Sequence, residues 1–282
     1  MITNEQRAKA NALLSLHNSG ELLVLPNVWD AIGARVLEQQ GYPAIATASA
    51  AIAESLGYAD GENIRLETML GAVSRIASSV SVPVTADMES GYADTVSALQ
   101  ETIVRVMQSG VVGINIEDSQ VGGGALRPLA EQCARIAAIR EVTARHDVHL
   151  VINARVDSFL SNSFGSQEEK IEEAVARAKA YVEAGADCIY PIGPGDLETV
   201  SQLRQRIPAP LNILASPKAI GLAELHRLGI NRVSFGPFIF RACLSKFVAI
   251  AEELKNSGDY ACFAENSLSG ADVRKFLVAG KE

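Results

Sequence analysis

Short apolar runs along the chain alternate with longer segments in which apolar residues recur every three to four positions. Four runs begin directly after Gly41, Gly110, Gly185 and Gly229. A glycine suits the left-handed position that follows a helix, and each run is too short and too rich in β-branched residues to be helical. Four similar runs cover residues 22–28, 82–89, 149–157 and 210–216. The pattern predicts eight strands.

The segments between these runs are amphipathic, as in Val96, Leu99, Ile103 and Val106, which is typical of helices packed on a sheet. Helix starts are predicted at Asp94 and Asp196 as N-caps, at Ser166 with Glu169 as a capping box, and at Pro217 as the first helical residue. Strands alternating with helices predict an α/β fold with a parallel sheet. We therefore predict a single (β/α)₈ TIM barrel over residues 1–282, with a helix at about 238–256 and an extra helical tail at about 259–282.

A doubly wound sheet would also alternate strands and helices. It would usually carry a glycine-rich phosphate-binding turn after the first strand, whereas residues 26–30 read Pro-Asn-Val-Trp-Asp. The three glycines at 122–124 lack the spacing of that motif, which favours a flexible loop, with a phosphate cradle as the alternative.

Composition narrows the functional classes. The 282 residues include 48% hydrophobic and 21% charged residues, and the net charge is −8. Without a basic block, nucleic-acid binding is not expected, and no apolar stretch is long enough for a membrane span. The four cysteines are widely separated and the N-terminus resembles no signal peptide, which predicts a reduced, cytoplasmic protein. Chemistry on a small molecule remains as the expected function.

Acidic residues gather where the predicted strands end, which is where barrel enzymes place their sites. Alternation predicts that Asp87 and Glu89 share one face, and Glu117 ends the next strand. Three converging carboxylates would repel one another unless a hard cation such as Mg²⁺ or Mn²⁺ lay among them. Arg155 would supply a fork for a substrate carboxylate. Asp30, Asp118 and Asp157 also follow or end predicted strands, and for them a role in the site and a role as caps of the next helix are equal alternatives.

Four segments resemble the isocitrate lyase and phosphoenolpyruvate mutase superfamily in order and spacing across about residues 22–245. They are residues 44–61, 82–92, 110–119 and 151–157. The resemblance implies a barrel whose last helix is exchanged between the subunits of a dimer or tetramer.

The resemblance also implies roles for individual residues. Asp87 would bind Mg²⁺ directly, and Glu89, Glu117 and Asp60 would act through water, with Glu89 standing where the family usually has Asp. Thr47, Ala48 and Ser49 would hold the enolate oxygen and carboxylate through backbone N–H groups, and Arg155 would bind the substrate carboxylate. The loop at 58–60 would be a mobile lid. Asn212 has the parity to face inward and bind substrate, although a bond to a neighbouring strand is an equal alternative.

The loop at 119–128 departs from the family. The lyases place a Lys-Arg-Cys-Gly-His sequence there, whose cysteine is the general acid, and this chain has no cysteine, lysine or histidine in the loop. Arg127 is its only cation, and it would either anchor a distal anionic group or cap the next helix. Cleavage of isocitrate or methylisocitrate by the usual route is therefore not expected.

These observations predict a Mg²⁺-dependent carbon–carbon lyase, in which Asp60, Glu117 and Arg155 are the catalytic candidates. The enzyme would cleave or decarboxylate a small 2-oxo or 2-hydroxy acid through an enolpyruvate-like intermediate. Two alternatives stay open: carbon–phosphorus chemistry of the phosphonomutase or phosphonopyruvate hydrolase type, and a catalytically silent barrel that binds a 2-oxo acid.

Overall fold

The computed structural model describes residues 2–121, 125–258, 260–263 and 267–277. Its strands are β1 (Leu23–Leu25), β2 (Asn27–Val28), β3 (Ile45–Thr47), β4 (Val84–Asp87), β5 (Gly113–Glu117), β6 (Val151–Val156), β7 (Cys188–Pro191), β8 (Asn212–Leu214) and β9 (Arg232–Ser234). All eight predicted segments contain a strand. Pro26 divides the first of them into β1 and β2, since proline has no N–H to donate to a sheet.

Every strand pair in the described residues is parallel. One sheet has the order β2-β3-β4-β5-β6-β7, and a second has the order β1-β9-β8. A single parallel bridge joins Ile189 to Leu211, between the two sheets. The α/β fold with a parallel sheet is confirmed, and closure into a barrel stays a prediction.

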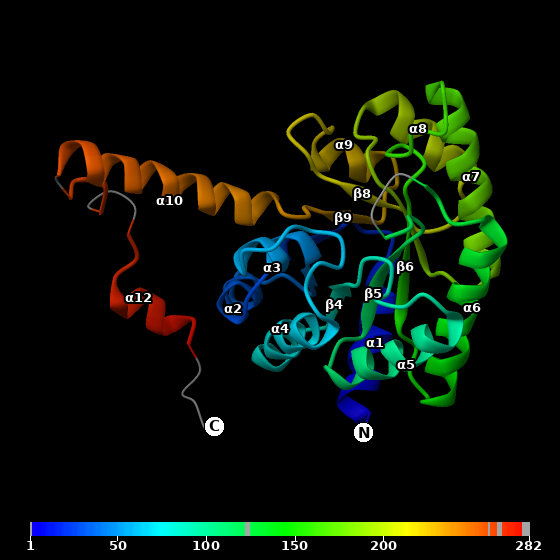
Figure 1. Cartoon of the computed structure of the whole chain (residues 1–282), viewed down its shortest axis with the longest axis horizontal. Helices are drawn as coiled ribbons and strands as arrows, with labels where there is room; N and C mark the ends of the chain where they lie inside the picture. The colour runs from blue at the N-terminus through cyan, green and yellow to red at the C-terminus, as the bar shows by residue number, and fades with distance from the viewer. Residues whose placement is uncertain (1, 122–124, 259, 264–266, 278–282) are drawn as a thin grey trace.

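Helices follow most of the strands and surround them (Figure 1). They are α1 (Asn4–His17), α2 (Ala31–Gln39), α3 (Ser49–Ser55), α4 (Leu66–Ser79), α5 (Val96–Gln108), α6 (Leu129–Arg145), α7 (Gln167–Glu183), α8 (Leu197–Arg206), α9 (Leu222–Arg227), α10 (Phe238–Ser257) and α12 (Gly270–Lys275).

Two of the predicted helix starts are confirmed and two are wrong. Asp196 caps α8, and Ser166 with Glu169 forms the capping box of α7. The N-cap of α5 is Thr95, one residue after Asp94, because its hydroxyl accepts the N–H of Ala98. Pro217 lies in a turn, and α9 begins only at Leu222.

Helix α1, which the sequence pattern did not predict, packs against the amino ends of the strands. Its Ala10 and Leu13 form a small core with residues of β1, β3 and β6, and with Ala44 and Val112, which directly precede β3 and β5. The approach is close enough that a Cβ on Gly113 would lie 2.8 Å from Leu13 Cδ2. His17 ends α1, is fully buried and accepts a hydrogen bond from Arg232 through Nε2 (3.3 Å).

Helix α10 extends away from the rest of the molecule (Figure 1). None of its residues is buried, although Leu244, Phe247 and Val248 are large and apolar. The predicted tail beyond it contains α12, while residues 259, 264–266 and 278–282 of that tail lie outside the described part. Exchange of α10 between subunits stays a prediction. No helix among the described residues has the length and apolar character needed to cross a membrane.

Candidate functional site

A cavity of about 160 Å³ opens where the strands end. Its lining comes from seven of the strands and from the loops and helices that follow them. The lining residues are Asn27, Ala48, Ser49, Ala50, Asp60, Asp87, Asn115, Arg155, Tyr190, Ile192, Leu214, Ser234, Gly236, Pro237 and Arg241. The cavity therefore brings together Ala48, Ser49, Asp60, Asp87 and Arg155, five of the residues that the sequence analysis named as candidates.

Asp87 ends β4 and is fixed to the start of α3. Its Oδ2 accepts the Ser49 hydroxyl (2.8 Å) and the Ser49 N–H (3.2 Å), and its own N–H donates to Thr47 Oγ1 (3.0 Å). Asp87 lines the cavity, and its Oδ1 makes no hydrogen bond within the described part of the chain. Burial, and then the charge of Asp87, raise the pKa of Asp60 on the same wall. The two acids thus repel each other in a way that a cation would relieve.

Glu89 does not share a face with Asp87, which corrects the prediction from alternation. Strand β4 ends at Asp87, and Glu89 has a left-handed φ of 51°. Its Oε2 accepts the N–H groups of Gly61 (2.8 Å) and Glu62 (2.5 Å), and its Oε1 accepts the Tyr92 hydroxyl (2.8 Å). Burial raises the pKa of Glu89 to about 7 despite the Tyr92 hydrogen bond. Both carboxylate oxygens are therefore engaged with protein donors.

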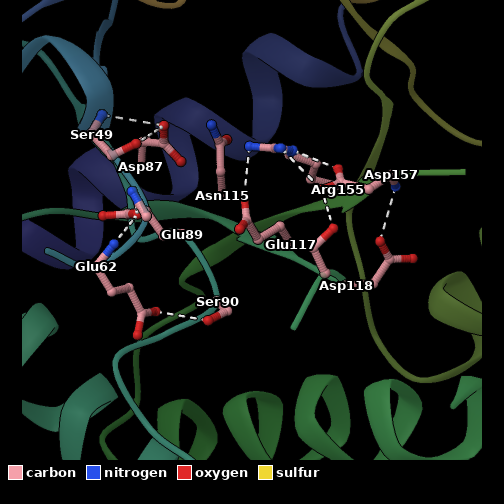
Figure 2. A network of polar contacts seen from close by, with 12 residues as sticks. Ser49, Glu62, Asp87, Glu89, Ser90, Asn115, Glu117, Asp118, Arg155 and Asp157 are labelled. Carbon is pink, nitrogen blue, oxygen red and sulfur yellow. Dashed lines mark hydrogen bonds and ion pairs between the residues drawn. The ribbon is translucent and has the colours of Figure 1, made fainter. Parts of the chain in front are cut away.

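Glu117 is paired with Arg155 and does not converge with the other acids. Arg155 Nη1 lies 2.5 Å from Glu117 Oε2, and Arg155 Nε lies 2.6 Å from Asp157 Oδ1 (Figure 2). Burial raises the pKa of Glu117 to about 8 against the opposing charge of Arg155. Burial alone would lower the pKa of Arg155, but the charges of Asp157 and Glu117 outweigh it and raise that pKa. Arg155 is thus held as a permanent cation, with two acids fixing the plane of its fork.

Three other candidates lie behind the cavity wall. Thr47 is fully buried and orients Asp87 through its hydroxyl. Asn212 is fully buried, and its Nδ2 donates to Ser234 on the neighbouring strand (3.1 Å). Asp118 accepts the Tyr181 hydroxyl (2.7 Å) and the N–H of Asp157 (2.9 Å), so it stabilises the strand end and caps no helix. Asp30, in contrast, is the N-cap of α2.

Backbone donors predicted for the substrate are engaged in this structure. The N–H of Ala48 donates to Val28, and the N–H of Ser49 donates to Asp87. A substrate would have to displace the Ser49 contact to use that donor.

A cluster of three metal-binding side chains is not formed within the described residues. Glu89 is turned toward Gly61 and Glu62, and Glu117 is paired with Arg155, so Asp87 remains with Asp60 nearby. Magnesium commonly keeps several water ligands and uses one or two carboxylates. The open Oδ1 of Asp87 and the raised pKa of Asp60 fit such a water-rich site.

The sequence analysis missed five polar residues of the cavity, which are Asn27, Asn115, Tyr190, Ser234 and Arg241. Asn115 Oδ1 accepts from Asn153 (2.8 Å) and from Arg232 (3.1 Å), which leaves its amide N–H₂ as the end available to a ligand. Tyr190 in β7 is nearly buried, and Arg241 in the first turn of α10 pairs with Glu54. Tyr190 has the inward parity of a strand residue, which was the available signal; a helical arginine carries no comparable signal.

The two described ends of the loop after β5, at 119–121 and 125–128, are joined by a single antiparallel bridge. Ser119 bridges to Leu126, and Arg127 forms an ion pair with Glu131 in the next helix (2.9 Å). This ion pair is not a helix cap, since Arg127 is buried and α6 begins after Pro128 without a side-chain cap, so the capping alternative for Arg127 is wrong. The glycines at 122–124, and with them the phosphate cradle, lie outside the described residues. Cysteine, lysine and histidine are absent from the described cavity lining.

Comparison with protein families finds one family across most of the chain. The model of the phosphoenolpyruvate phosphomutase family matches residues 13–255.

Individual relatives have several activities. An uncharacterized protein of Mycobacterium tuberculosis (strain CDC 1551 / Oshkosh) is 31% identical over 252 residues, covering 87% of this chain and 92% of its own. The 2-methylisocitrate lyase of Aeropyrum pernix is 30% identical, covering 87% and 80%. The oxaloacetate decarboxylase of Pseudomonas putida (strain GB-1) is 28% identical, covering 83% and 80%. The solved structure of 2,3-dimethylmalate lyase, a member of the PEP mutase/isocitrate lyase superfamily, is 26% identical with a TM-score of 0.83, covering 95% of this chain and 94% of that one.

Proposed function

Since the chain belongs to the phosphoenolpyruvate phosphomutase family, we propose that it is a Mg²⁺-dependent carbon–carbon lyase acting on a small 2-oxo or 2-hydroxy acid. The reaction that best fits its site is decarboxylation of an oxaloacetate-like acid. One observation carries this choice: the cavity combines a fixed arginine and an open aspartate oxygen with no thiol, amine or imidazole in its described lining.

The side chains have separable roles in this reaction. Arg155, oriented by Glu117 and Asp157, binds a substrate carboxylate in a bidentate manner. The amide N–H₂ of Asn115 donates to the substrate's oxo group, because Asn153 and Arg232 fix its orientation. Asp87 would hold Mg²⁺, and Asp60 on the same wall would assist it. The bound cation would supply positive charge for the oxyanion that develops as the bond breaks.

Decarboxylation is favoured because of how its protons balance. When the carbon–carbon bond of an oxaloacetate-like acid breaks, carbon dioxide leaves and the electron pair stays on the enolate. No proton from the enzyme is needed at that step, and water can protonate the enolate afterwards. Retro-aldol cleavage also needs a base to take the proton of the hydroxyl group and usually an acid for the departing enolate. The relative named oxaloacetate decarboxylase supports this choice.

A turnover screen tests the proposal. Purified protein is incubated with 2-oxo acids, 2-hydroxy acids and phosphonopyruvate, with Mg²⁺ or with EDTA. Mg²⁺-dependent carbon dioxide release from an oxaloacetate-like acid, well above the rate of Mg²⁺ alone, is the expected result. Turnover of phosphonopyruvate alone would support the carbon–phosphorus alternative, and binding without turnover would support a silent barrel.

The proposed enzyme is a closed barrel that exchanges α10 between subunits. Two links between the sheets support closure. Strand β1, which pairs with β9, continues along the chain into β2 of the other sheet, and a bridge joins Ile189 of β7 to Leu211 just before β8. Exchange is supported by the apolar side chains on α10, since monomers rarely expose such a stripe. Light scattering should find a dimer or tetramer, and Phe247→Glu, at a side chain that is 67% exposed, should weaken it. A monomer in both cases would refute the exchange.

A further inference from the structure

Two loops beside the cavity are joined by reciprocal hydrogen bonds, in which a glutamate carboxylate from each loop accepts from donors of the other loop. Glu89, just after β4, accepts the N–H groups of Gly61 and Glu62 through Oε2. In return, Glu62 Oε1 accepts the Ser90 hydroxyl (2.8 Å) and the N–H of Tyr92 (2.8 Å). Figure 2 shows Glu62 between Glu89 and Ser90, with contacts to both. We call these four side chains (Glu62, Glu89, Ser90 and Tyr92), with the backbone of Gly61, the glutamate clamp.

The backbone of the clamp is held in an unusual conformation. Glu62, Glu89 and Tyr92 have φ values of 57°, 51° and 53°. Non-glycine residues rarely adopt this region, and such conformations persist only where surrounding contacts enforce them. Between them, Gly91 at φ 97° is too crowded for a side chain, since a Cβ would lie 2.6 Å from Leu99 Cδ1. The hydrogen bonds of the clamp are therefore what maintains this arrangement.

A buried arginine fixes one side of the clamp. Arg135 in α6, which is 1% exposed, donates to the carbonyl groups of Ser90 and Ala93. The 89–93 loop is thereby anchored to the body of the fold. The loop at 60–63 ends at the buried Ile64, and Asp60 is within hydrogen-bonding reach of the Ser49 side chain. Among the described residues, the backbone N–H groups of Gly61 and Glu62 are held by the clamp, which therefore sets the conformation of the middle of this loop.

Asp60 directly precedes the two N–H groups that Glu89 accepts. The same loop brings Asp60 to the cavity wall, near enough to Asp87 for their charges to interact. We infer that Glu62 and Glu89 are positioning residues, which clamp the 60–63 loop so that the Asp60 carboxylate is held beside Asp87 at the cation site. This inference rests on the proposed function only for its effect on Mg²⁺.

The glutamate clamp depends on the length of the Glu89 side chain. An aspartate here, the residue that the resemblance leads one to expect, would be shorter by one carbon–carbon bond, about 1.5 Å, and would not reach both N–H groups. The glutamate is therefore committed to the neighbouring loop, which explains why it does not face the cation site.

Amide hydrogen exchange tests the clamp without any metal. In the unsubstituted protein, the N–H groups of Gly61 and Glu62 should be protected because Glu89 accepts both. Glu62→Ala and Glu89→Asp should each speed exchange at 61 and 62 by about tenfold or more, since the loop opens locally. Glu62→Gln retains an acceptor oxygen for Ser90 and Tyr92 and should restore protection. Unchanged exchange in Glu62→Ala would overturn the clamp.

Calorimetric titration with Mg²⁺ alone tests the positioning role. Glu62→Ala should raise the Mg²⁺ dissociation constant by about tenfold or more, the scale for loss of a contact that orients a metal ligand, and Glu62→Gln should stay close to the unsubstituted protein. Glu67→Ala, a surface acid on α4 that pairs with Arg105 outside the clamp, controls for the loss of one negative charge. Equal Mg²⁺ affinity in Glu62→Ala, with fast exchange at 61 and 62, would overturn the positioning role. Absence of Mg²⁺ binding in the unsubstituted protein would refute the metal site of the proposed function, and the exchange rates would still decide the clamp.

Discussion

Acidification should destabilise the fold through His17, the residue that joins α1 to the interior of the strands. His17 is fully buried, its Nδ1–H donates to the carbonyl of Leu13 (2.8 Å), and its Nε2 accepts from Arg232. The contact with Arg232 requires the neutral ring, because a protonated Nε2 cannot accept, whereas Nδ1–H can donate to Leu13 in either protonation state. Burial, and then the positive charge of Arg232, lower the pKa of His17 from 6.5 to about 4.

The sign and size of the effect follow from this difference. Below pH 6.5 the unfolded chain takes up a proton at His17, while the folded protein resists until about pH 4. The contribution of neutral His17 to the free energy of unfolding is therefore fully present above pH 6.5 and is lost as the pH falls toward 4. At about 1.4 kcal/mol for each pH unit, the total loss is about 3 kcal/mol, of which about 2 kcal/mol is lost by pH 5.

Urea denaturation between pH 7.5 and 4.5 measures this loss. Other groups also titrate in this range, so the decisive quantity is the difference between the unsubstituted protein and His17→Gln. Glutamine can donate to Leu13 and accept from Arg232 without taking up a proton. The variant should lose about 2 kcal/mol less free energy of unfolding between pH 7 and pH 5. His226→Gln, on the exposed side of α9, controls for the substitution. Parallel curves for His17→Gln and the unsubstituted protein would refute the reasoning.

Three further predictions concern the site. Asp87→Ala should abolish Mg²⁺-dependent turnover while circular dichroism stays unchanged, because Asp87 is the proposed direct ligand and has an oxygen open to the cavity; normal turnover at saturating substrate would contradict the metal assignment. Arg155→Lys should lower kcat/KM by an amount that corresponds to a loss of about 2–5 kcal/mol in transition-state binding, since lysine cannot reproduce the guanidinium fork that two acids hold. An unchanged kcat/KM would contradict the role of Arg155. A variant with all four cysteines replaced by alanine should keep its kcat if it folds, because none of them lines the cavity, whereas loss of turnover in a folded protein would reveal a thiol acid.

Sequence patterning predicted the strands well because buried parallel strands are continuous apolar runs, and each follows a glycine or a polar turn. It located Asp87 and Arg155 at the cavity because strand ends share one edge of the sheet. It failed for Glu89, since period-two alternation holds only while the strand continues and a left-handed φ redirects the side chain. It also missed α1, whose role depends on burial against the strands, and Asn115, whose orientation is set by the distant Arg232.

The pairing of β1 with β9 has a consequence for synthesis of the chain. Residues 23–25 find their hydrogen-bond partners at 232–234, about 200 positions later. While the nascent chain emerges from the ribosome, β1 must therefore wait for almost the whole polypeptide, and His17 at the end of α1 waits equally long for Arg232. Contacts of such high sequence separation form late and slowly. A chain cut short before residue 232 would thus leave β1 with an unpaired strand edge, which is prone to aggregation.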